Sequence, residues 1–229
     1  MSRGAIRAYP PDGAAAGADP LLDGLEYVVV DCETTGGSPG RGHRMTEVAA
    51  IRVDRRGRIR DEFHTLLNPL RPIPRSVTGL TNITERMVTG APLFVEIAPR
   101  LQAILAGAVF VAHNAPFDLR FMEWEMKRGD YGPPKGRVLC TARLARRVIP
   151  EMRNRSLDAL IYFYGLTCEP RHRAYPDARA TVDVLVRLLD RAEDSGVGTW
   201  IELNTLLDRR KRRVKRSALP RSMEFPEWA

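Results

Sequence analysis

The stretch Leu25-Glu26-Tyr27-Val28-Val29-Val30-Asp31-Cys32-Glu33-Thr34-Thr35-Gly36 joins a run of apolar, mostly β-branched residues to two acids. The run from Tyr27 to Val30 predicts a strand that is buried on both faces. Because side chains alternate along a strand, Asp31 and Glu33 should project from one face and Cys32 from the other. Two carboxylates on one patch raise each other's pKa unless a cation lies beside them, so the pattern indicates a metal site at the end of this strand.

The composition sets limits on the class of protein. The 229 residues suit one domain with tails, and 44% hydrophobic residues are enough for a core. A net charge of +8 and a pI near 9.9 favour a phosphate-rich partner, with a solvated basic surface as the alternative. The three widely spaced cysteines fit a reducing compartment and neither a disulfide framework nor a zinc knuckle. No apolar run approaches the roughly 18 residues of a membrane span, and the N-terminus lacks a signal-peptide core, so we expect no membrane partner and a cytoplasmic location.

Changes in composition predict three parts along the chain. Residues 1–23 are rich in Ala, Gly and Pro and predict a flexible leader, residues 24–194 hold the compact domain, and residues 195–229 form a basic extension. Within the compact part, the segments 46–53 and 58–67 predict a hairpin with Gly57 in the turn. Further apolar strands at 108–112 and 138–140 alternate with helical patterns. The predicted fold class is therefore α/β, a mixed five-stranded sheet flanked by helices on both faces.

Two more acids stand where other elements meet. Asp118 follows the strand at 108–112, where capping of the next helix is its ordinary explanation, and Asp177 heads a long helix that runs to about residue 192. Loops at the carboxyl ends of neighbouring strands gather beside one another, so both acids can join Asp31 and Glu33 in one cleft. Four carboxylates would neutralise two divalent cations, and oxygen ligands favour Mg²⁺ or Mn²⁺ over zinc. Two such ions can activate water for attack on a phosphodiester.

Hydrolysis of this kind also needs a general base, and histidine is the usual candidate because its pKa lies near 6.5. His64 lies inside a strand pattern and is interpreted as structural. His113 and His172 each precede an aspartate by five residues, so their spacing does not choose between them. His113 ends an apolar strand, whereas His172 lies among arginines in a segment with the character of an exposed loop that can swing over the cleft. The residues alone leave both histidines open.

Three segments carry a resemblance to a known family: DCETTG from Asp31, HNAPFD ending at Asp118 and HRAYPD ending at Asp177. In order and context they resemble the three motifs of the DEDDh-type 3′-to-5′ exonucleases, the family of the epsilon proofreading subunit of bacterial DNA polymerase III. The flanking segments MTEVAAIRV, NPLRPIP, GLTNITERMV, LCTARLARR and SLDALIYFYGL agree as well, so the likeness covers about residues 27–191. It implies an RNase H-like fold for the exonuclease domain at 24–194. It also implies metal-dependent hydrolysis of the 3′-terminal phosphodiester of DNA, preferably at single-stranded or frayed ends, with release of nucleoside monophosphates.

The resemblance further implies a role for each matching residue. Asp31, Glu33 and Asp177 would bind one divalent ion, the first of them would also reach a second ion, and Asp118 would act largely through water. His172 would be the general base. The pocket for the 3′-terminal nucleotide would be lined by Thr34, Thr35 and Gly36 and shaped by His113, Asn114 and Phe117, although packing around a tight loop is an alternative role for the last three.

The end of the chain is strongly basic. Seven of the eight residues from 209 to 216 are cationic, namely Arg209, Arg210, Lys211, Arg212, Arg213, Lys215 and Arg216. Such a run repels itself until it meets phosphate, so we expect it to contact nucleic acid, with a solvated tail as the alternative. Residues 221–225 faintly resemble the sliding-clamp peptide of the epsilon subunit, but Pro220 stands where that peptide has glutamine, and chance similarity is the favoured interpretation.

Two other functions stay open from the sequence. The first is an RNA-trimming exonuclease of the same superfamily, similar to RNase T or oligoribonuclease, which would depend on contacts to the 2′-hydroxyl group. The second is an adaptor that no longer cuts and binds nucleic acid, a DNA polymerase or a sliding clamp. The sequence does not separate proofreading from repair as the role of the leading candidate.

Overall fold

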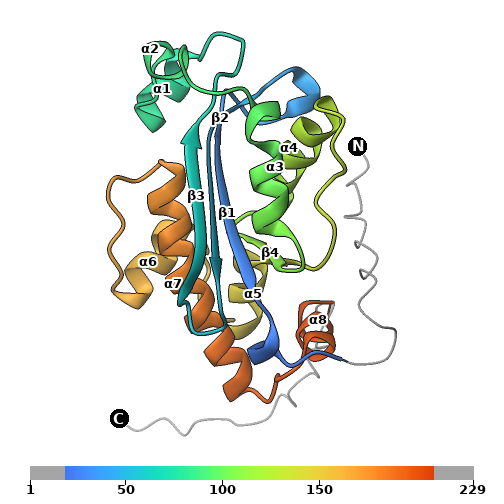
Figure 1. Cartoon of the computed structure of the whole chain (residues 1–229). Helices are drawn as coiled ribbons and strands as arrows, with labels where there is room; N and C mark the ends of the chain where they lie inside the picture. Colours follow the sequence, from blue (N-terminus) through green and yellow to red (C-terminus); the bar gives the residue numbers. More distant parts are fainter. Residues whose placement is uncertain (1–18, 209–229) are drawn as a thin grey trace, which may run out of the picture.

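Five strands form one mixed sheet in the order β3-β2-β1-β4-β5 (Figure 1). The structure is a computed structural model that describes residues 19–208. In it β1 (Tyr27–Thr34) pairs antiparallel with β2 (Met45–Val53), which pairs antiparallel with β3 (Ile59–Leu66). On the other side of β1 lie β4 (Val109–Ala112) and then β5 (Val138–Cys140), both parallel to their neighbours. The predicted α/β class and mixed five-stranded sheet are confirmed.

Helices cover both faces of this sheet, as predicted (Figure 1). One face packs against α5 (Thr141–Val148), α6 (Leu157–Tyr164), α7 (Ala174–Asp194) and α8 (Trp200–Asp208), and the other against α3 (Phe94–Leu105) and α4 (Ala115–Arg128). The side chains of β1 alternate between the two cores, with Val29 on the α7 side and Val30 and Cys32 on the α4 side. The strand is therefore apolar on both faces, and Asp31 and Glu33 project toward α7.

A small pair of helices lies at the end of the sheet where β1 finishes (Figure 1). It contains α1 (Arg75–Thr81) and α2 (Glu85–Val88), which pack around their own apolar cluster of Ile73, Ile83 and Val88. Thr84 caps the start of α2, because its hydroxyl accepts a hydrogen bond from the Met87 amide at 3.4 Å. Short 3-10 turns occupy Leu22–Gly24 and Pro39–Arg41.

Two helices begin earlier than the sequence predicted. α4 starts at Ala115 and α7 at Ala174, so Pro116 and Pro176 lie inside the first helical turn instead of before it. Proline is tolerated there because the amides of the first turn have no partner within the helix. The alternative interpretation of Asp118 as the cap of α4 is therefore excluded. Asp118 is the fourth residue of the helix, and its carboxylate is used elsewhere.

The packed structure extends beyond residues 24–194 at both ends. Leu22 is fully buried and its amide donates a hydrogen bond to the Gly198 carbonyl at 2.9 Å, while Leu203 and Leu207 of α8 join the core beside α5. The basic run at 209–216 and the segment at 221–225 lie outside the described residues. Within residues 19–208, no helix combines the length and the apolar character needed to cross a bilayer.

Candidate active site

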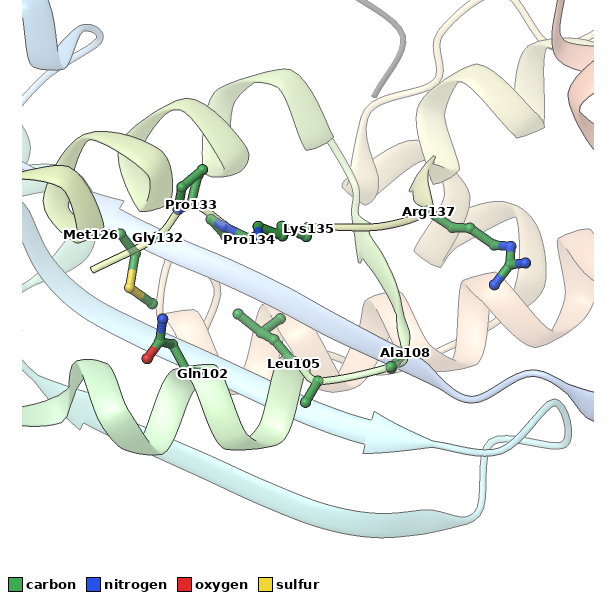
Figure 2. Close-up of a pocket in the computed structure, with 11 residues that line it drawn as sticks. Gln102, Leu105, Ala108, Met126, Gly132, Pro133, Pro134, Lys135 and Arg137 are labelled. Atoms are coloured by element: carbon green, nitrogen blue, oxygen red, sulfur yellow. The ribbon is translucent and has the colours of Figure 1, made fainter. Parts of the chain in front are cut away.

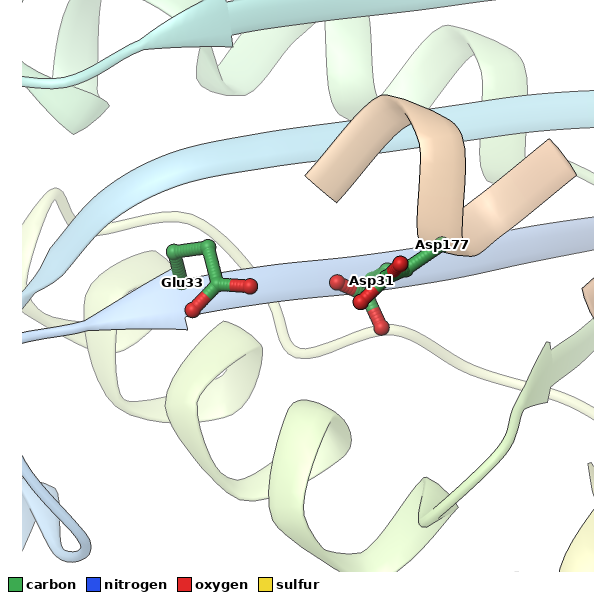
Figure 3. Close-up of side chains that lie close together, drawn as sticks. All are labelled: Asp31, Glu33 and Asp177. Carbon is green, nitrogen blue, oxygen red and sulfur yellow. The ribbon is translucent and has the colours of Figure 1, made fainter. Parts of the chain in front are cut away.

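Three of the predicted acids converge beside the end of β1 (Figure 3). Asp31 and Glu33 lie two residues apart on the same face of the strand, and Asp177 reaches them from the first turn of α7. One carboxylate oxygen from each residue lies within 4.8 Å of the other two. The register of the strand and the early start of α7 together place these oxygens, which are separated by up to 146 residues in sequence.

Asp118 reaches the same strand from the side of α4. Its side chain is only 4% exposed, and its Oδ1 atom accepts a hydrogen bond from the Cys32 amide at 3.1 Å. The pairing of β1 with β4 ends at Val29, so the carboxylate takes the place of a strand partner for Cys32. Asp118 is not among the three converging acids, but it lies close enough to raise the pKa of Asp31.

Burial and mutual repulsion hold protons on these acids. Burial first, and then the charges of Asp118 and Glu33, raise the pKa of Asp31 well above its ordinary value. Burial, the Glu47 carboxylate and Asp118 raise the pKa of Glu33 to about 7. Burial also raises the pKa of Asp118 to about 7, although the hydrogen bonds that its carboxylate accepts oppose this shift. The site as a whole is short of positive charge.

The loop before α7 supplies one cation to this cluster. Asp177 accepts hydrogen bonds from the Arg171 guanidinium and from the His172 amide, the latter at 3.2 Å. Arg171 is held on its other side by Asp158 of α6, whose carboxylate accepts a bond from Nε at 2.6 Å. The sequence carries no signal for the pair of Arg171 and Asp158, because the two residues belong to different elements and neither stands in an acidic motif.

A second ion pair holds the same loop at Arg173, the residue that follows His172. Glu47 of β2 stands opposite Glu33 in the strand register and is 3% exposed. Its oxygens accept two bonds from the Arg173 guanidinium, at 2.7 and 2.9 Å, and one from the Ala174 amide at 2.9 Å. The sequence did carry a signal for this residue, since an acid inside the apolar run MTEVAAIRV needs a buried partner.

A divalent cation fits this arrangement. Around the end of β1 stand five carboxyl groups, from Asp31, Glu33, Glu47, Asp118 and Asp177, against the two guanidinium groups of Arg171 and Arg173. The three converging oxygens form a hard, oxygen-only donor set of the kind that Mg²⁺ and Mn²⁺ prefer. A cation among them would remove the repulsion that raises their pKa values.

The two candidate histidines differ in what their rings contact. The Nδ1 atom of His113 lies 3.0 Å from the Thr141 hydroxyl, and Nε2 lies 2.9 Å from the Arg155 carbonyl. A carbonyl can only accept, so Nε2 carries the proton and Nδ1 accepts from Thr141. Burial, the largest cause, lowers the pKa of His113. This ring has no free nitrogen with which to take a proton from a substrate.

His172 is held by its backbone and not by its ring. It is half-buried, has a left-handed backbone with φ of 59°, and donates its amide to Asp177. Among residues 19–208, its ring makes no hydrogen bond. Its charge lowers the pKa of Asp158, after the larger effect of Arg171, so the ring lies near the start of α6. Of the two histidines, His172 therefore keeps both ring nitrogens available.

The residues expected to line a nucleotide pocket continue directly from Glu33. The Thr34 hydroxyl donates to the Gly36 carbonyl at 2.9 Å, and the Thr35 hydroxyl accepts from the Arg44 amide at 3.0 Å. Both threonines are buried. A Cβ atom on Gly36 would lie 2.7 Å from the His43 ring, so only glycine lets the chain pass so closely. The segment 34–36 is a fixed loop and not a free turn.

Asn114 and Phe117 stand at the start of α4. Asn114 is exposed and its carbonyl accepts from the Phe117 amide at 2.7 Å, while the half-buried ring of Phe117 packs on Phe121 with centroids 5.0 Å apart. His113, by contrast, is turned toward Thr141 and Arg155. Of the three residues, Asn114 is the most accessible to a ligand, whereas Phe117 packs on Phe121 and the His113 ring is held by hydrogen bonds.

One cavity in the described part of the chain lies away from the acids. It measures about 670 Å³ and lies between the end of α3 and the chain after α4 (Figure 2). Ala108 and Arg137 line it, and they immediately precede β4 and β5, so the cavity is at the opposite end of these strands from Asp118. Its lining contains no acid or histidine. The cavity therefore lacks the groups that hydrolysis needs.

Comparisons with known proteins identify the family of the chain. The profile of the RNase_T exonuclease family matches residues 28–185, a span that contains all five predicted catalytic positions. The chain is 41% identical over 193 residues to a DNA polymerase III subunit epsilon-like protein of Rhodobacter capsulatus, covering 82% of this chain and 27% of that protein. It is 36% identical over 191 residues to a PolC-type DNA polymerase III of Caldanaerobacter subterraneus subsp. tengcongensis, covering 83% and 13%.

A solved structure shows the same fold. Exonuclease X, in complex with 5′-overhanging duplex DNA, is 28% identical and superposes with a TM-score of 0.61 over 79% of this chain and 99% of that one. The RNase H-like fold implied by the sequence motifs is thereby confirmed. The chain spans less than a third of the length of the first curated relatives that it matches. Because the family profile covers more than half of its residues, the chain belongs to the RNase_T exonuclease family.

Proposed function

We propose that this exonuclease is a divalent-metal-dependent enzyme that removes nucleotides from the 3′ end of DNA, preferably single-stranded or frayed, and releases nucleoside monophosphates. The observation that carries the proposal is the convergence of oxygens from Asp31, Glu33 and Asp177 within 4.8 Å. Those residues, with Asp118 beside them, would hold two Mg²⁺ or Mn²⁺ ions. When bound, such ions would activate a water and stabilise the leaving oxygen of a phosphodiester.

The chain's own residues would then complete the reaction. His172 would take the proton of the attacking water, since its ring is not engaged by the described residues. The Asp177 bond to the His172 amide and the Glu47–Arg173 pair hold the backbone on both sides of that histidine. The fixed loop at 34–36 and the exposed Asn114 would receive the terminal nucleotide, while His113 and Phe117 would shape its surroundings.

DNA is favoured as substrate because the relatives named above are DNA polymerase III proteins and an exonuclease bound to DNA. Because these relatives are DNA polymerase III proteins, the proposal includes a role in proofreading or repair, with a polymerase or sliding clamp as partner. The basic run at 209–216 is proposed to add contacts to phosphate. The RNA-trimming alternative differs only in tolerance of the 2′-hydroxyl.

Degradation of end-labelled oligomers tests the direction and the substrate together. A 5′-labelled single-stranded DNA oligomer incubated with the protein and Mg²⁺ should yield a ladder of progressively shorter labelled products. Immediate appearance of a labelled mononucleotide would contradict the 3′-to-5′ direction. A matched RNA oligomer run in parallel decides between the two substrates, because faster loss of RNA would favour the trimming enzyme.

A further inference from the structure

Exposed aromatic side chains lie at the end of α6. Tyr162 is 90% exposed and Phe163 41%, and Tyr164 packs edge-on against Phe163 with centroids 4.9 Å apart. Two arginines of α7 lie over this group, with Arg191 5.5 Å from the Phe163 ring and Arg187 5.9 Å from the Tyr164 ring. These five residues are called the aromatic–arginine strip below.

The strip begins beside the carboxylate cluster. Asp158 bonds Arg171, which in turn bonds Asp177. Tyr162 stands four residues after Asp158, so both lie on one face of α6, about 6 Å apart along its axis. On α7, Arg187 is ten residues from Asp177, which corresponds to about 15 Å of helix. The strip therefore leads away from the cluster over a distance that the next few nucleotides of a strand could span.

The arginines of the strip keep their charge available. Among the described residues, no carboxylate forms an ion pair with Arg187 or Arg191. The acid next to Arg191 in sequence, Asp190, is held by Arg55 at 2.9 Å. Within residues 19–208, Arg187 donates a hydrogen bond to a backbone carbonyl, that of Asp183 at 3.2 Å. Both arginines are half-buried over the rings and have no carboxylate partner among the described residues, so an external anion could supply the missing counter-charge.

We propose that the aromatic–arginine strip binds single-stranded nucleic acid on the 5′ side of the nucleotide that is removed. The inference rests on the proposed function, because it places the strip along the path of a strand whose 3′ end lies at the carboxylates. Exposed aromatic rings stack on any base, and arginines beside them neutralise phosphates, so the combination suits a strand without sequence preference. A solvated pair of aromatic residues without a ligand is the opposing interpretation.

Binding without catalysis tests the strip directly. The probes are fluorescein-labelled oligothymidylate and oligouridylate of roughly ten nucleotides, a typical length for single-strand sites, with fluorescence anisotropy measured in EDTA on the full chain. Tyr162→Ala should weaken binding about fivefold or more, because one stacked base is lost. Tyr162→Phe should bind like the wild type. Ile201→Ala, at a 59% exposed apolar residue on α8, is the matched control and should change nothing.

The salt dependence of binding tests the arginines separately from the aromatic rings. Arg191→Gln should lower the slope of log affinity against log salt concentration by about 0.7, the value for one phosphate contact on a single strand. The proposal is overturned if Tyr162→Ala binds both oligomers with wild-type affinity. It is also overturned if Arg191→Gln leaves the salt slope unchanged. Loss of affinity for oligothymidylate alone, or for oligouridylate alone, would support the strip and identify the strand that it binds.

A mononucleotide substrate separates this inference from the proposed function. Hydrolysis of the p-nitrophenyl ester of thymidine 5′-monophosphate, in Mn²⁺, uses the carboxylate site without a longer strand. Equal hydrolysis by wild type and Tyr162→Ala, combined with weaker oligomer binding in the variant, supports the strip. Wild-type protein that binds oligomers through Tyr162 but leaves the ester intact would contradict the proposed function and uphold the strip.

Discussion

The buried carboxylate of Glu47 and the half-buried guanidinium of Arg173 form a two-bond ion pair next to His172. The guanidinium donates to both carboxylate oxygens, at 2.7 and 2.9 Å, and Glu47 also accepts from the first amide of α7. This acid therefore ties β2 to the start of the helix that presents Asp177. It connects the stability of the fold to the position of the proposed base.

Replacement of Glu47 by glutamine should cost both stability and activity. The amide keeps the size of the side chain but leaves Arg173 without its counter-charge, so the free energy of unfolding should fall by about 1–3 kcal/mol. Nuclease activity should fall further than the loss of folded protein explains. Urea unfolding and rate measurements check both effects. Asp61→Asn is the control, because its pair with Arg100 is exposed and should contribute about 0–1 kcal/mol; an equal loss in both variants would contradict the assignment.

Arg171→Ala should bind divalent metal more tightly than the wild type. The guanidinium contacts Asp177 and lowers the pKa of Asp31 and Glu33, so it competes with a cation for the same oxygens. Its removal should strengthen Mn²⁺ binding by roughly three- to tenfold. Calorimetric titration of the nuclease without substrate measures this, and Arg143→Ala, on the surface of α5, should leave the affinity unchanged. Weaker binding in Arg171→Ala would show that the arginine supports the site instead.

The metal-free protein should lose stability as the pH rises. Glu33 and Asp118 have folded pKa values of about 7, above their ordinary values near 4, so the folded state holds more protons than the unfolded chain between those limits. Their contribution to stability is therefore greatest at acid pH and is lost as the pH approaches about 7. The melting temperature in EDTA should fall between about pH 5 and pH 8.

Excess Mg²⁺ should reduce that fall, since metal competes with protons for the same oxygens. Asp118→Asn should flatten the profile in EDTA, because an amide does not titrate. A melting temperature in EDTA that rises over the same range in wild type but not in Asp118→Asn would reverse the assigned sign.

His113 should give the opposite dependence. Burial lowers its folded pKa, so below about pH 6.5 the unfolded chain takes up a proton that the folded state refuses. Its contribution to stability is complete above that value and declines as the pH falls, by up to about 1.4 kcal/mol per pH unit. Because this effect opposes that of Glu33 and Asp118, the fall in the urea midpoint in EDTA between about pH 5.5 and 7.5 should be larger in His113→Gln than in wild type. Equal differences would mean that this ring titrates normally.

Much of the fold and of the carboxylate site was predictable because local patterns encode it. The alternation in β1 fixes which face Asp31 and Glu33 share, and the apolar runs fix the strands. Partnerships between distant residues were not predictable in the same way. The bond from Cys32 to Asp118 joins residues 86 apart, and the bond from Arg173 to Glu47 joins residues 126 apart. Such pairs depend on how helices pack against the sheet, which a single sequence pattern does not specify.

The starts of α4 and α7 were predicted a few residues too late. The sequence pattern placed the starts at about Leu119 and Asp177, whereas the helices begin at Ala115 and Ala174, with Pro116 and Pro176 in the first turn. The difference of three or four residues matters here, because it changes Asp118 from a helix cap into the acceptor for the Cys32 amide.

The most direct test of the carboxylate site is release of nucleotide from a 3′-labelled single-stranded DNA oligomer in Mn²⁺, by wild type and by Asp31→Ala. Wild-type protein should release labelled mononucleotide, EDTA should stop the release, and Asp31→Ala should fall to the background without protein. Asp194→Ala, at an exposed acid at the end of α7, should retain full activity. Wild-type rates in Asp31→Ala, or release that continues in EDTA, would contradict a metal-dependent nuclease built on these carboxylates.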